Sequence, residues 1–295
     1  MIIIDMNQIM ISNLMTQIKK AYLDENLVRF LVLRNLSNYE KQYGDEFGEI
    51  VLAYDSKHYW RKDYFPYYKW SRKKDRKKSG LNWSSIFDLL NQIKDEIKQN
   101  FHYKVVEVDG AEADDVIAVL CKNKQPKERI LILSGDKDFI QLHRYPGVQQ
   151  YNPVTKRYVT SENPWTYIRQ HVIKGDKSDG IPNFLSDDDT FVKGIRQRPI
   201  SQKKLNVWVH KDPSYFCKTE EELANYNRNL TLIDCDYIPD DIQLKILEEF
   251  NSLNTAERTV PMDYFHKHQL NELMDRFYVS TVNVAMFNTN ETINV

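Results

Sequence analysis

Four short, nearly continuous apolar runs constrain the fold of this chain more than any other feature of its sequence. They occupy residues 1–4, 49–54, 104–108 and 129–133, and stretches with apolar residues at helical spacing separate them. Continuous apolar runs are typical of strands in a parallel sheet, because helices cover both faces of such a sheet. The alternation predicts an α/β fold, a mostly parallel central sheet flanked by helices, and leaves the order of the strands open.

The character of the sequence changes after about residue 180. A loop-rich segment with Gly, Pro and charges of both signs is followed by helical patterns such as residues 219–233, where Thr219 and Glu222 form a plausible capping box. We therefore expect an α/β domain over residues 1–180, with a basic insertion at about 56–80, and a smaller, mainly helical region over residues 181–295.

Composition restricts the class of protein. Hydrophobic residues make up 41% of the chain and charged residues 28%, which is typical of a soluble globular protein. The three cysteines have spacings that fit neither a disulfide framework nor a zinc site, which favours a reducing, cytoplasmic setting. The first residues lack the basic segment of a signal peptide, and no apolar run is long enough to span a membrane. We expect a cytoplasmic protein without a membrane partner.

Acidic residues follow all four apolar runs. Because ligands of open α/β sheets bind beyond the carboxyl ends of the strands, these acids are expected to converge. They are Asp5, Asp55, Glu112, Asp114, Asp115, Asp136 and Asp138, joined by Asp176 and Asp179 from a later loop. So many carboxylates in one place stay ionised only beside cations. Hard oxygen ligands suit two Mg²⁺ ions, with Mn²⁺ able to substitute, and we expect no His or Cys to compete for them.

The ordinary interpretation of any one of these acids is a helix cap or a turn residue. Asp115 is the best cap candidate among them, and Asn163 before Pro164 has the same capping chemistry farther along the chain. A single Asp-x-Asp pair is weak support for a metal site. The occurrence of acids after all four apolar runs is what favours a metal site.

A basic and aromatic segment, here called the basic arm (residues 56–80), follows Asp55 directly. Basic side chains neutralise phosphates, and aromatic rings stack on unpaired bases. The alternative, a solvated basic loop, does not explain the many aromatic residues. Candidates for binding nucleic acid are Lys57, Lys62, Tyr68, Lys73, Lys74, Arg76, Lys77 and Lys78.

A polyanion held beside an acidic cluster implies metal between them, and so phosphodiester hydrolysis by a two-metal mechanism. Lys69 and Arg72 are the candidates for neutralising the scissile phosphate.

Five segments, in this order, resemble the structure-specific 5′-nuclease family, which comprises flap endonucleases and the 5′-nuclease domains of bacterial DNA polymerases. They read "IIIDMNQ", "YDSKHYWRKDYFPYYKWSR", "EADDVIAVL", "LSGDKDFIQL" and "KGDKSDGIPN". The resemblance spans roughly residues 1–245 and is strongest to phage members of the family. It implies a Mg²⁺-dependent 5′-to-3′ exonuclease and flap endonuclease with ribonuclease H activity. Such an enzyme acts on RNA–DNA hybrids and on DNA duplexes with a 5′ flap or nick, and removes RNA primers during lagging-strand replication.

The resemblance also implies roles for individual residues. The first metal would be surrounded by Asp5, Asp55, Glu112, Asp114 and Asp136. The second would be served, partly through water, by Asp138, Asp176 and Asp179, with Asp115 nearby as a further catalytic candidate. Arg61, Lys69 and Arg72 match basic residues of the family's arch, which admits a single-stranded 5′ end.

The region after Asp179 corresponds to a helix–loop–helix module that holds duplex DNA by its backbone. A sliding clamp and a single-strand-binding protein are the partners implied, and the chain is expected to be a monomer, in the host cytoplasm if a phage encodes it. Asp187, Asp188 and Asp189 depart from the pattern, because they lie where contact with the DNA backbone is expected.

Two other functions stay open at the level of sequence. A metal-dependent ribonuclease of the PIN type would share the acid-lined sheet but lack the basic arm and the duplex-holding half. A non-catalytic nucleic-acid-binding protein would bind without cleaving when Mg²⁺ is supplied.

Overall fold

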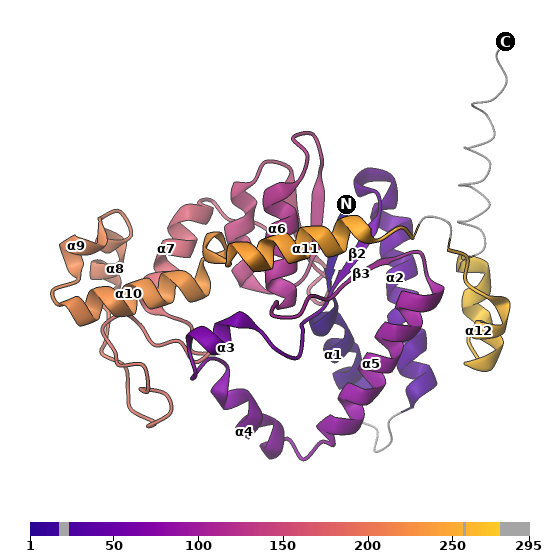
Figure 1. Ribbon diagram of the computed structural model, residues 1–295, viewed down its shortest axis with the longest axis horizontal. Helices are drawn as coiled ribbons and strands as arrows, with labels where there is room; N and C mark the ends of the chain where they lie inside the picture. The colour runs from indigo at the N-terminus through magenta and orange to yellow at the C-terminus, as the bar shows by residue number, and fades with distance from the viewer. Residues whose placement is uncertain (18–23, 256–257, 278–295) are drawn as a thin grey trace, which may run out of the picture.

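The computed structural model describes residues 1–17, 24–255 and 258–277 (Figure 1). At its centre lies a six-stranded sheet in the order β3-β2-β1-β4-β5-β6. The first five strands run parallel, and β6 is antiparallel to β5. The strands are β1 (Ile2–Asp5), β2 (Ile50–Ala53), β3 (Lys104–Val106), β4 (Ile130–Leu133), β5 (Val148–Asn152) and β6 (Arg157–Val159). The expected mostly parallel sheet is confirmed, and β5 and β6 extend it beyond the four expected strands.

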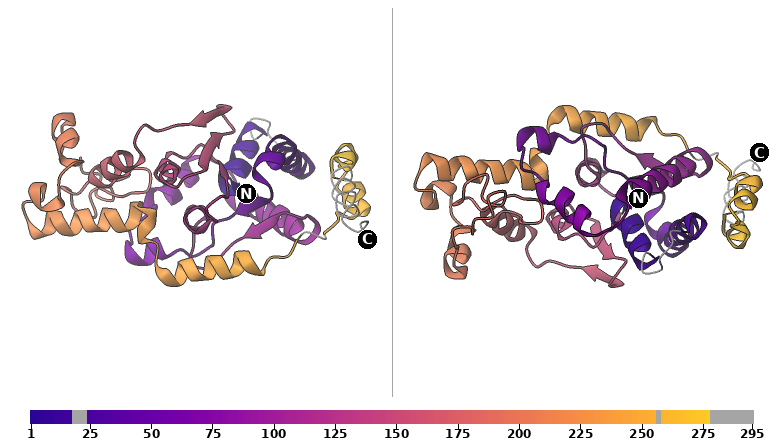
Figure 2. Two further views of the ribbon diagram at one scale, coloured as in Figure 1. Left: turned by 90° about the horizontal axis from the view of Figure 1, so that it is seen from above. Right: turned by 90° about the horizontal axis from the view of Figure 1, so that it is seen from below.

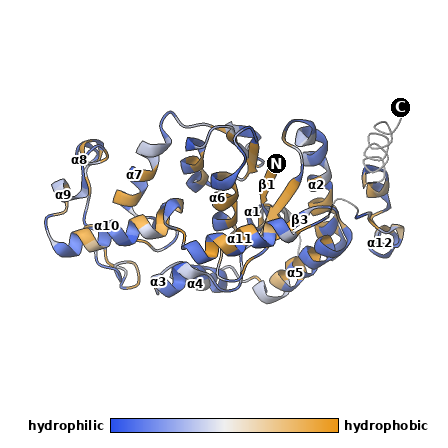
Figure 3. Cartoon of the chain, turned by 45° about the horizontal axis from the view of Figure 1, so that its top comes forward, coloured by the Kyte–Doolittle hydropathy of each residue, from blue (hydrophilic) through white to orange (hydrophobic). Residues whose placement is uncertain are grey.

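Helices cover both faces of the sheet, as the continuous apolar runs require. Successive side chains of a strand point to opposite faces. Ile2 and Ile4 accordingly pack with α1, α2 and α5, whereas Ile3 packs on the other face with α6 and α11. The covering helices are α1 (Met6–Gln17), α2 (Glu25–Phe47), α5 (Trp83–Asn100), α6 (Ala113–Asn123) and α11 (Asp240–Ser252). In Figure 3 the strand β1 has the colour of hydrophobic residues, as a strand buried on both faces should.

The amphipathic stripe expected on residues 86–97 forms the buried face of α5. Its members Ile86, Leu89, Leu90, Ile93 and Ile97 are all buried. The same core receives Tyr264 and Phe265 from α12 (Met262–Lys267), which lies at the end of the molecule beyond α2 and α5 (Figure 2). The chain therefore returns to the α/β part after its helical region.

A third hydrophobic core lies beside the sheet. It joins α7 (Pro164–Lys174), α8 (Gln202–Trp208), α9 (Pro213–Phe216) and α10 (Glu220–Ile233) to two side chains of the basic arm, Phe65 and Tyr68. This arrangement confirms the helical C-terminal region. The boundary expected near residue 180 stays a prediction.

The basic arm contains two short helices, α3 (Trp60–Tyr64) and α4 (Trp70–Lys78). In Figure 1 the arm runs as a bow from β2 through α3 and α4 to α5. Among the described residues, no helix combines the length and the apolar character needed to cross a membrane.

Candidate active site

Acids from separate strands meet at one edge of the sheet. Asp5 is the last residue of β1, Asp55 follows β2, and Asp136 follows β4 as the cap of the short helix η1 (Lys137–Arg144). Asp114 lies in the first turn of α6, after β3. The parallel strands bring these ends together, and each of these acids lies near enough to others of the group to change a neighbour's pKa. The convergence expected from the sequence is present.

Two acids of this group, Asp5 and Asp114, need a counter-charge. Burial raises the pKa of Asp5 from its usual 3.8 to about 6, and repulsion from Asp55 and Asp136 adds to the rise. Burial raises the pKa of Asp114 well above its usual range, and the positive charge of Lys69 only partly opposes it. Carboxylates held together in this way favour a bound cation. The donor set, oxygen atoms of several carboxylates, fits a hard divalent ion.

Backbone and hydroxyl donors orient these acids. Asp5 accepts hydrogen bonds from the Gln8 backbone N–H and the Ser134 hydroxyl, each at 3.1 Å. Asp55 accepts one from the Ala113 N–H at 2.8 Å, which ties it to the start of α6. Asp136 accepts one from the Asp138 N–H at 2.9 Å. Each carboxylate is therefore held at the sheet edge by the turn that follows its own strand or the next.

Glu112, expected among the ligands of the first metal, is engaged by the basic arm. Its carboxylate accepts hydrogen bonds from Lys69 Nζ at 2.6 Å, Arg61 at 3.0 Å and the Tyr68 hydroxyl at 3.0 Å. Burial alone would raise the pKa of Glu112, but these cations lower it below its usual range. Its observed role is to fasten the arm, and its role as a metal ligand stays a prediction.

Asp115 has a capping role rather than a place facing a substrate. It accepts a hydrogen bond from the Glu112 N–H at 2.9 Å, so it caps α6 from inside the first turn, whereas Glu112 occupies the cap position itself. It also pairs with Arg61 at 2.7 Å and is fully buried. The catalytic role expected for Asp115 does not fit this burial.

Two functional candidates of the arm are buried: Arg61, expected in the arch, and Tyr68, expected to bind nucleic acid. Arg61 is 4% exposed and Tyr68 is 3% exposed. Arg61 pairs with Glu112 and Asp115 and donates to the Leu232 carbonyl at 3.0 Å, so all its charge is directed into the protein. The expectations that Arg61 lines the arch and that Tyr68 binds nucleic acid are corrected: both side chains anchor the arm.

The other two basic candidates, Lys69 and Arg72, differ in how far their side chains are exposed to solvent. Lys69 is buried between Glu112 and Asp179, whereas Arg72 is about half exposed and pairs with Asp179 at 2.8 Å. Both line a cavity of about 370 Å³ that also contains Asp114, Asp136 and Asp138. Positive charge therefore reaches the acids from the arm side of the cavity, as expected for Lys69 and Arg72.

The outer part of the arm presents its charge to solvent. Lys57, Lys62, Lys74, Arg76, Lys77 and Lys78 are exposed, as expected for a surface that binds a polyanion. The side chain of Lys73 lies outside the described residues. Of the arm's aromatic residues, Tyr64 is the most exposed at 49%, and Phe65 and Tyr68 are buried in the third core. The expectation that the aromatic residues stack on bases is therefore replaced by a packing role for most of them.

The base of the arm is joined to the loop that carries Asp176 and Asp179. The Lys69 N–H donates to the Asp179 carbonyl at 2.8 Å, from a residue whose φ of 55° lies in the left-handed region. Gly180, with a φ of +76°, lies so close that a Cβ there would stand 2.8 Å from the Tyr67 carbonyl oxygen. We call these contacts the arm–loop junction. They fix the arm relative to the acids of the second expected metal position.

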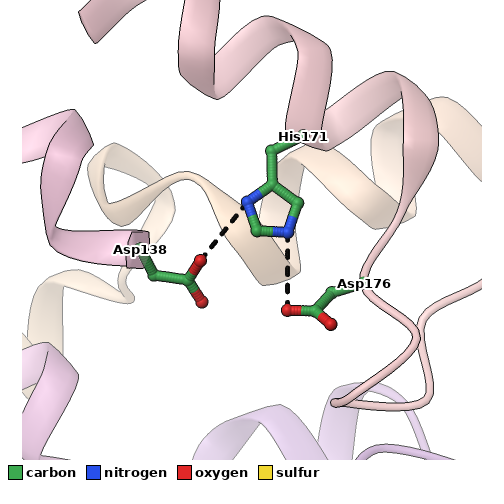
Figure 4. A group of neighbouring side chains, drawn as sticks. All are labelled: Asp138, His171 and Asp176. Atoms are coloured by element: carbon green, nitrogen blue, oxygen red, sulfur yellow. Dashed lines mark ion pairs between the residues drawn. The ribbon is translucent and has the colours of Figure 1, made fainter. Parts of the chain in front are cut away.

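A histidine lies among the acids of that second position, contrary to expectation. His171, in the last turn of α7, has its ring between Asp138 and Asp176 (Figure 4). Burial raises the pKa of Asp138 to about 7 even though His171 opposes the rise. In the sequence His171 appears as a lone residue five positions before Asp176, with no spacing that marks it as part of a site.

Two of the three acids that depart from the family pattern form ion pairs within the protein. Asp188 pairs with Arg228, and Asp189 pairs with Lys193 at 2.6 Å. A cavity of about 560 Å³ nearby is lined by basic side chains from the loop and α7, namely Lys174, Lys177, Arg196 and Arg198. The loop therefore offers a cationic surface despite its run of acids.

An α/β sheet with convergent acids at its carboxyl edge, beneath a basic arm, is the architecture of a metal-dependent nuclease. The model of the 5′-3′ exonuclease N-terminal resolvase-like domain matches residues 4–172, and that of the C-terminal domain of T4 RNase H matches residues 164–278. The chain belongs to the 5′-3′ exonuclease family. The prediction of an enzyme of the nuclease class is thereby confirmed.

Particular relatives agree with this assignment. The chain is 34% identical to ribonuclease H of Enterobacteria phage T4 over 282 residues, 92% of each protein. It is 30% identical to a 5′-3′ exonuclease of Buchnera aphidicola over 250 residues, 77% of this chain and 83% of the relative.

Solved structures from bacteriophage T5 share the fold. The T5 5′-exonuclease with bound zinc has a TM-score of 0.58 at 16% identity, covering 85% of this chain and 98% of that one. The T5 flap endonuclease in a pseudo-enzyme-product complex with DNA and metal ions has a TM-score of 0.59 at 18% identity, covering 85% and 99%. The basic arm and the helical half are both present, so the PIN-type alternative is set aside.

Proposed function

We propose that this protein is a Mg²⁺-dependent 5′-to-3′ exonuclease and flap endonuclease. Its substrates are RNA–DNA hybrids and DNA duplexes with a 5′ flap or nick, and its task is the removal of RNA primers in lagging-strand replication. The observation that carries the proposal is the convergence of Asp5, Asp55, Asp114 and Asp136 at one sheet edge, with Arg72 and Lys69 facing the same cavity. The similarity to a phage ribonuclease H and to a flap endonuclease solved with DNA supports RNA–DNA hybrids and flapped DNA as substrates.

The chemistry follows from the residues at this edge. Two Mg²⁺ ions, or Mn²⁺ in their place, would supply Lewis acidity and an activated water when bound. The acids would hold the ions, and the hydrogen bonds to Asp5, Asp55 and Asp136 keep the carboxylates oriented for this role. Arg72 and Lys69 offset the negative charge that develops on the phosphate in the transition state.

Two basic surfaces match the two parts of a flap substrate. The exposed lysines and arginines of α4 suit a single-stranded 5′ end. The cavity lined by Lys174, Lys177, Arg196 and Arg198 suits the backbone of a duplex. The acids lie against the base of the arm, which is joined to their loop. A substrate that engages both surfaces is thereby directed to the acids, which supports a preference for junctions over free strands.

The cellular setting is part of the same proposal. A monomer working with a sliding clamp and a single-strand-binding protein, in the cytoplasm of a host cell, fits the resemblance to phage members of the family. Light scattering behind size-exclusion chromatography tests the monomer, and co-elution with each purified partner tests the two complexes.

A single assay tests the activity. A 5′-labelled RNA–DNA flap substrate incubated with and without Mg²⁺ should give short 5′ products in the presence of the ion only. Asp136→Asn should reduce cleavage by about 10²–10³-fold, the loss typical when one group that supports transition-state stabilisation is removed. DNA binding should persist, because the repulsion toward phosphate falls. Asp45→Asn, an exposed acid of α2, is the matched control. Full turnover by Asp136→Asn would rule out its proposed role.

A further inference from the structure

His171 places both nitrogens of its ring against acids of the second metal position. Its Nδ1 lies 3.3 Å from Asp138 Oδ1, and its Nε2 lies 3.4 Å from Asp176 Oδ2. Figure 4 shows the ring between the two carboxylates, which come from η1 and from the loop after α7. One ligand atom from each of the three residues lies within 4.8 Å of the other two. This spacing is short enough for a single ion to contact all three.

The hydrogen bonding of this group is incomplete as long as the ring is neutral, because each ring nitrogen faces a carboxylate. Nδ1 of His171 is buried and, within the described residues, has no hydrogen-bond partner, although Asp138 is close. A neutral imidazole has one N–H and one lone pair, so it donates to only one of two facing carboxylates. A buried nitrogen without a partner costs about 1–3 kcal/mol. A metal ion bound by a ring nitrogen would remove this cost and draw the carboxylates in.

The surroundings hold the three residues in place and leave ligand atoms available. Oδ1 of Asp176 accepts hydrogen bonds from the Ser178 N–H at 2.7 Å and hydroxyl at 2.6 Å, so Oδ2 remains directed at His171. The helix that carries His171 is anchored by Val172 and Ile173 in the third core. All three side chains line the same cavity as Asp114 and Asp136, so an ion can reach them.

We propose that His171 is a nitrogen ligand of the second metal position, an inference that rests on the proposed two-metal site. Imidazole suits Zn²⁺ and other transition ions, whereas sites made of carboxylates alone suit Mg²⁺. The two positions then differ in selectivity. The all-oxygen position around Asp5 and Asp55 prefers Mg²⁺, and the position of Asp138, His171 and Asp176 prefers Zn²⁺ or Co²⁺, whereas Mn²⁺ can fill both.

Pulsed electron paramagnetic resonance on the DNA-free full chain loaded with Mn²⁺ tests the assignment directly. The wild type should show modulation from a directly bound ¹⁴N nucleus, and His171→Gln should lose it. His210→Gln, which changes an exposed histidine just after α8, is the matched control and should retain it. Circular dichroism establishes that each variant is folded.

Metal competition gives an independent measurement. His171→Gln should weaken Zn²⁺ binding at least tenfold and Mg²⁺ binding less than threefold, because only the nitrogen ligand is removed. Equal losses for both ions would overturn the inference, since His171 would then only orient Asp176. Mn²⁺ bound without nitrogen modulation in the wild type would also overturn it and leave the proposed nuclease intact. Failure to bind Mn²⁺ at all would overturn both.

Discussion

Arg61 and Lys62 are neighbours in the sequence with the same charge, but the structure gives them opposite environments. Arg61 is buried against Glu112 and Asp115, and Lys62 is exposed. Composition and motif give both residues a functional role, Arg61 in the arch and Lys62 in binding nucleic acid, because neither reports which side of a short helix faces the protein. The acids were predictable for a different reason: a residue that ends a parallel strand has its position fixed by the sheet. His171 was not predictable, because its place depends on how α7 packs.

The contrast between these neighbours is measurable. Arg61→Gln should lower the free energy of unfolding by about 3–5 kcal/mol, because it leaves buried carboxylates without their partner. Lys62→Gln should change it by less than about 0.5 kcal/mol and instead lower the slope of log binding constant against log salt by about 0.7–0.9. Urea unfolding and salt titrations of DNA binding provide the two values. Equal effects of the two variants on stability would contradict the anchoring role of Arg61.

Asp5 makes the metal-free protein sensitive to pH. Since burial raises its pKa from 3.8 to about 6, the folded state binds more protons than the unfolded state between these values. The stability due to this group is therefore present at low pH and is lost as pH rises through 6. Relative to Asp5→Asn, the wild type in a chelator should lose roughly 2 kcal/mol between pH 4.5 and 7.5. Urea unfolding at both values checks this, and a constant difference between the two proteins would refute it.

At the scale of elements, hydrophobic periodicity predicted the strands that are buried on both faces and the buried stripe of α5. It missed the two strands at the polar edge of the sheet. The four apolar runs became β1 to β4, and the stripe of α5 is buried as expected. β5 and β6 contain Gln149, Gln150 and Arg157, so they lack the apolar run that marks a central strand. Thr219 caps α10 as expected, but Glu222 accepts from the Lys218 N–H rather than completing the capping box.

The helix α4 is expected to act as an electrostatic surface rather than a stacking one. Replacing its exposed Lys74, Lys77 and Lys78 with Gln should lower the salt slope of DNA binding by about 2–3, because each lysine that neutralises a phosphate adds close to one. A triple Gln variant of the exposed lysines 41, 122 and 245, on other elements, is the control and should keep the wild-type slope. A wild-type slope in the α4 variant would show that the helix does not touch the nucleic acid.

At the scale of the whole molecule, the helical half completes the basic arm. Phe65 and Tyr68 from the arm and Ile168 and Val172 from α7 share one core with α8, α9 and α10. The sequence suggested a boundary near residue 180 because the composition changes there. Packing across the boundary could not be predicted, because it depends on contacts between residues more than a hundred positions apart.

This packing makes a truncation informative. A chain ending at residue 180 also lacks α11 and α12, so it should expose the core surfaces that these helices cover as well as Phe65, Tyr68, Ile168 and Val172. The cost is about 1.5–3 kcal/mol for each side chain that loses its burial. We expect trypsin to cut its arm at Lys62 or Lys69 much faster than it cuts the full chain. Limited proteolysis followed by mass spectrometry measures the rates. An arm equally protected in both chains would mean that the first 180 residues are a self-sufficient unit.

The arm–loop junction restricts how such a protein can be re-engineered. The Lys69 N–H is bonded to the Asp179 carbonyl, and Gly180 leaves no room for a Cβ beside the Tyr67 carbonyl, so the two segments fit together through their backbones. An arch grafted from another nuclease would lack the turn around Asp179 and Gly180 against which its base has to pack. A working chimera therefore has to exchange residues 56–80 and 175–182 as one cassette, and the same coupling obliges evolution to alter the two segments in concert.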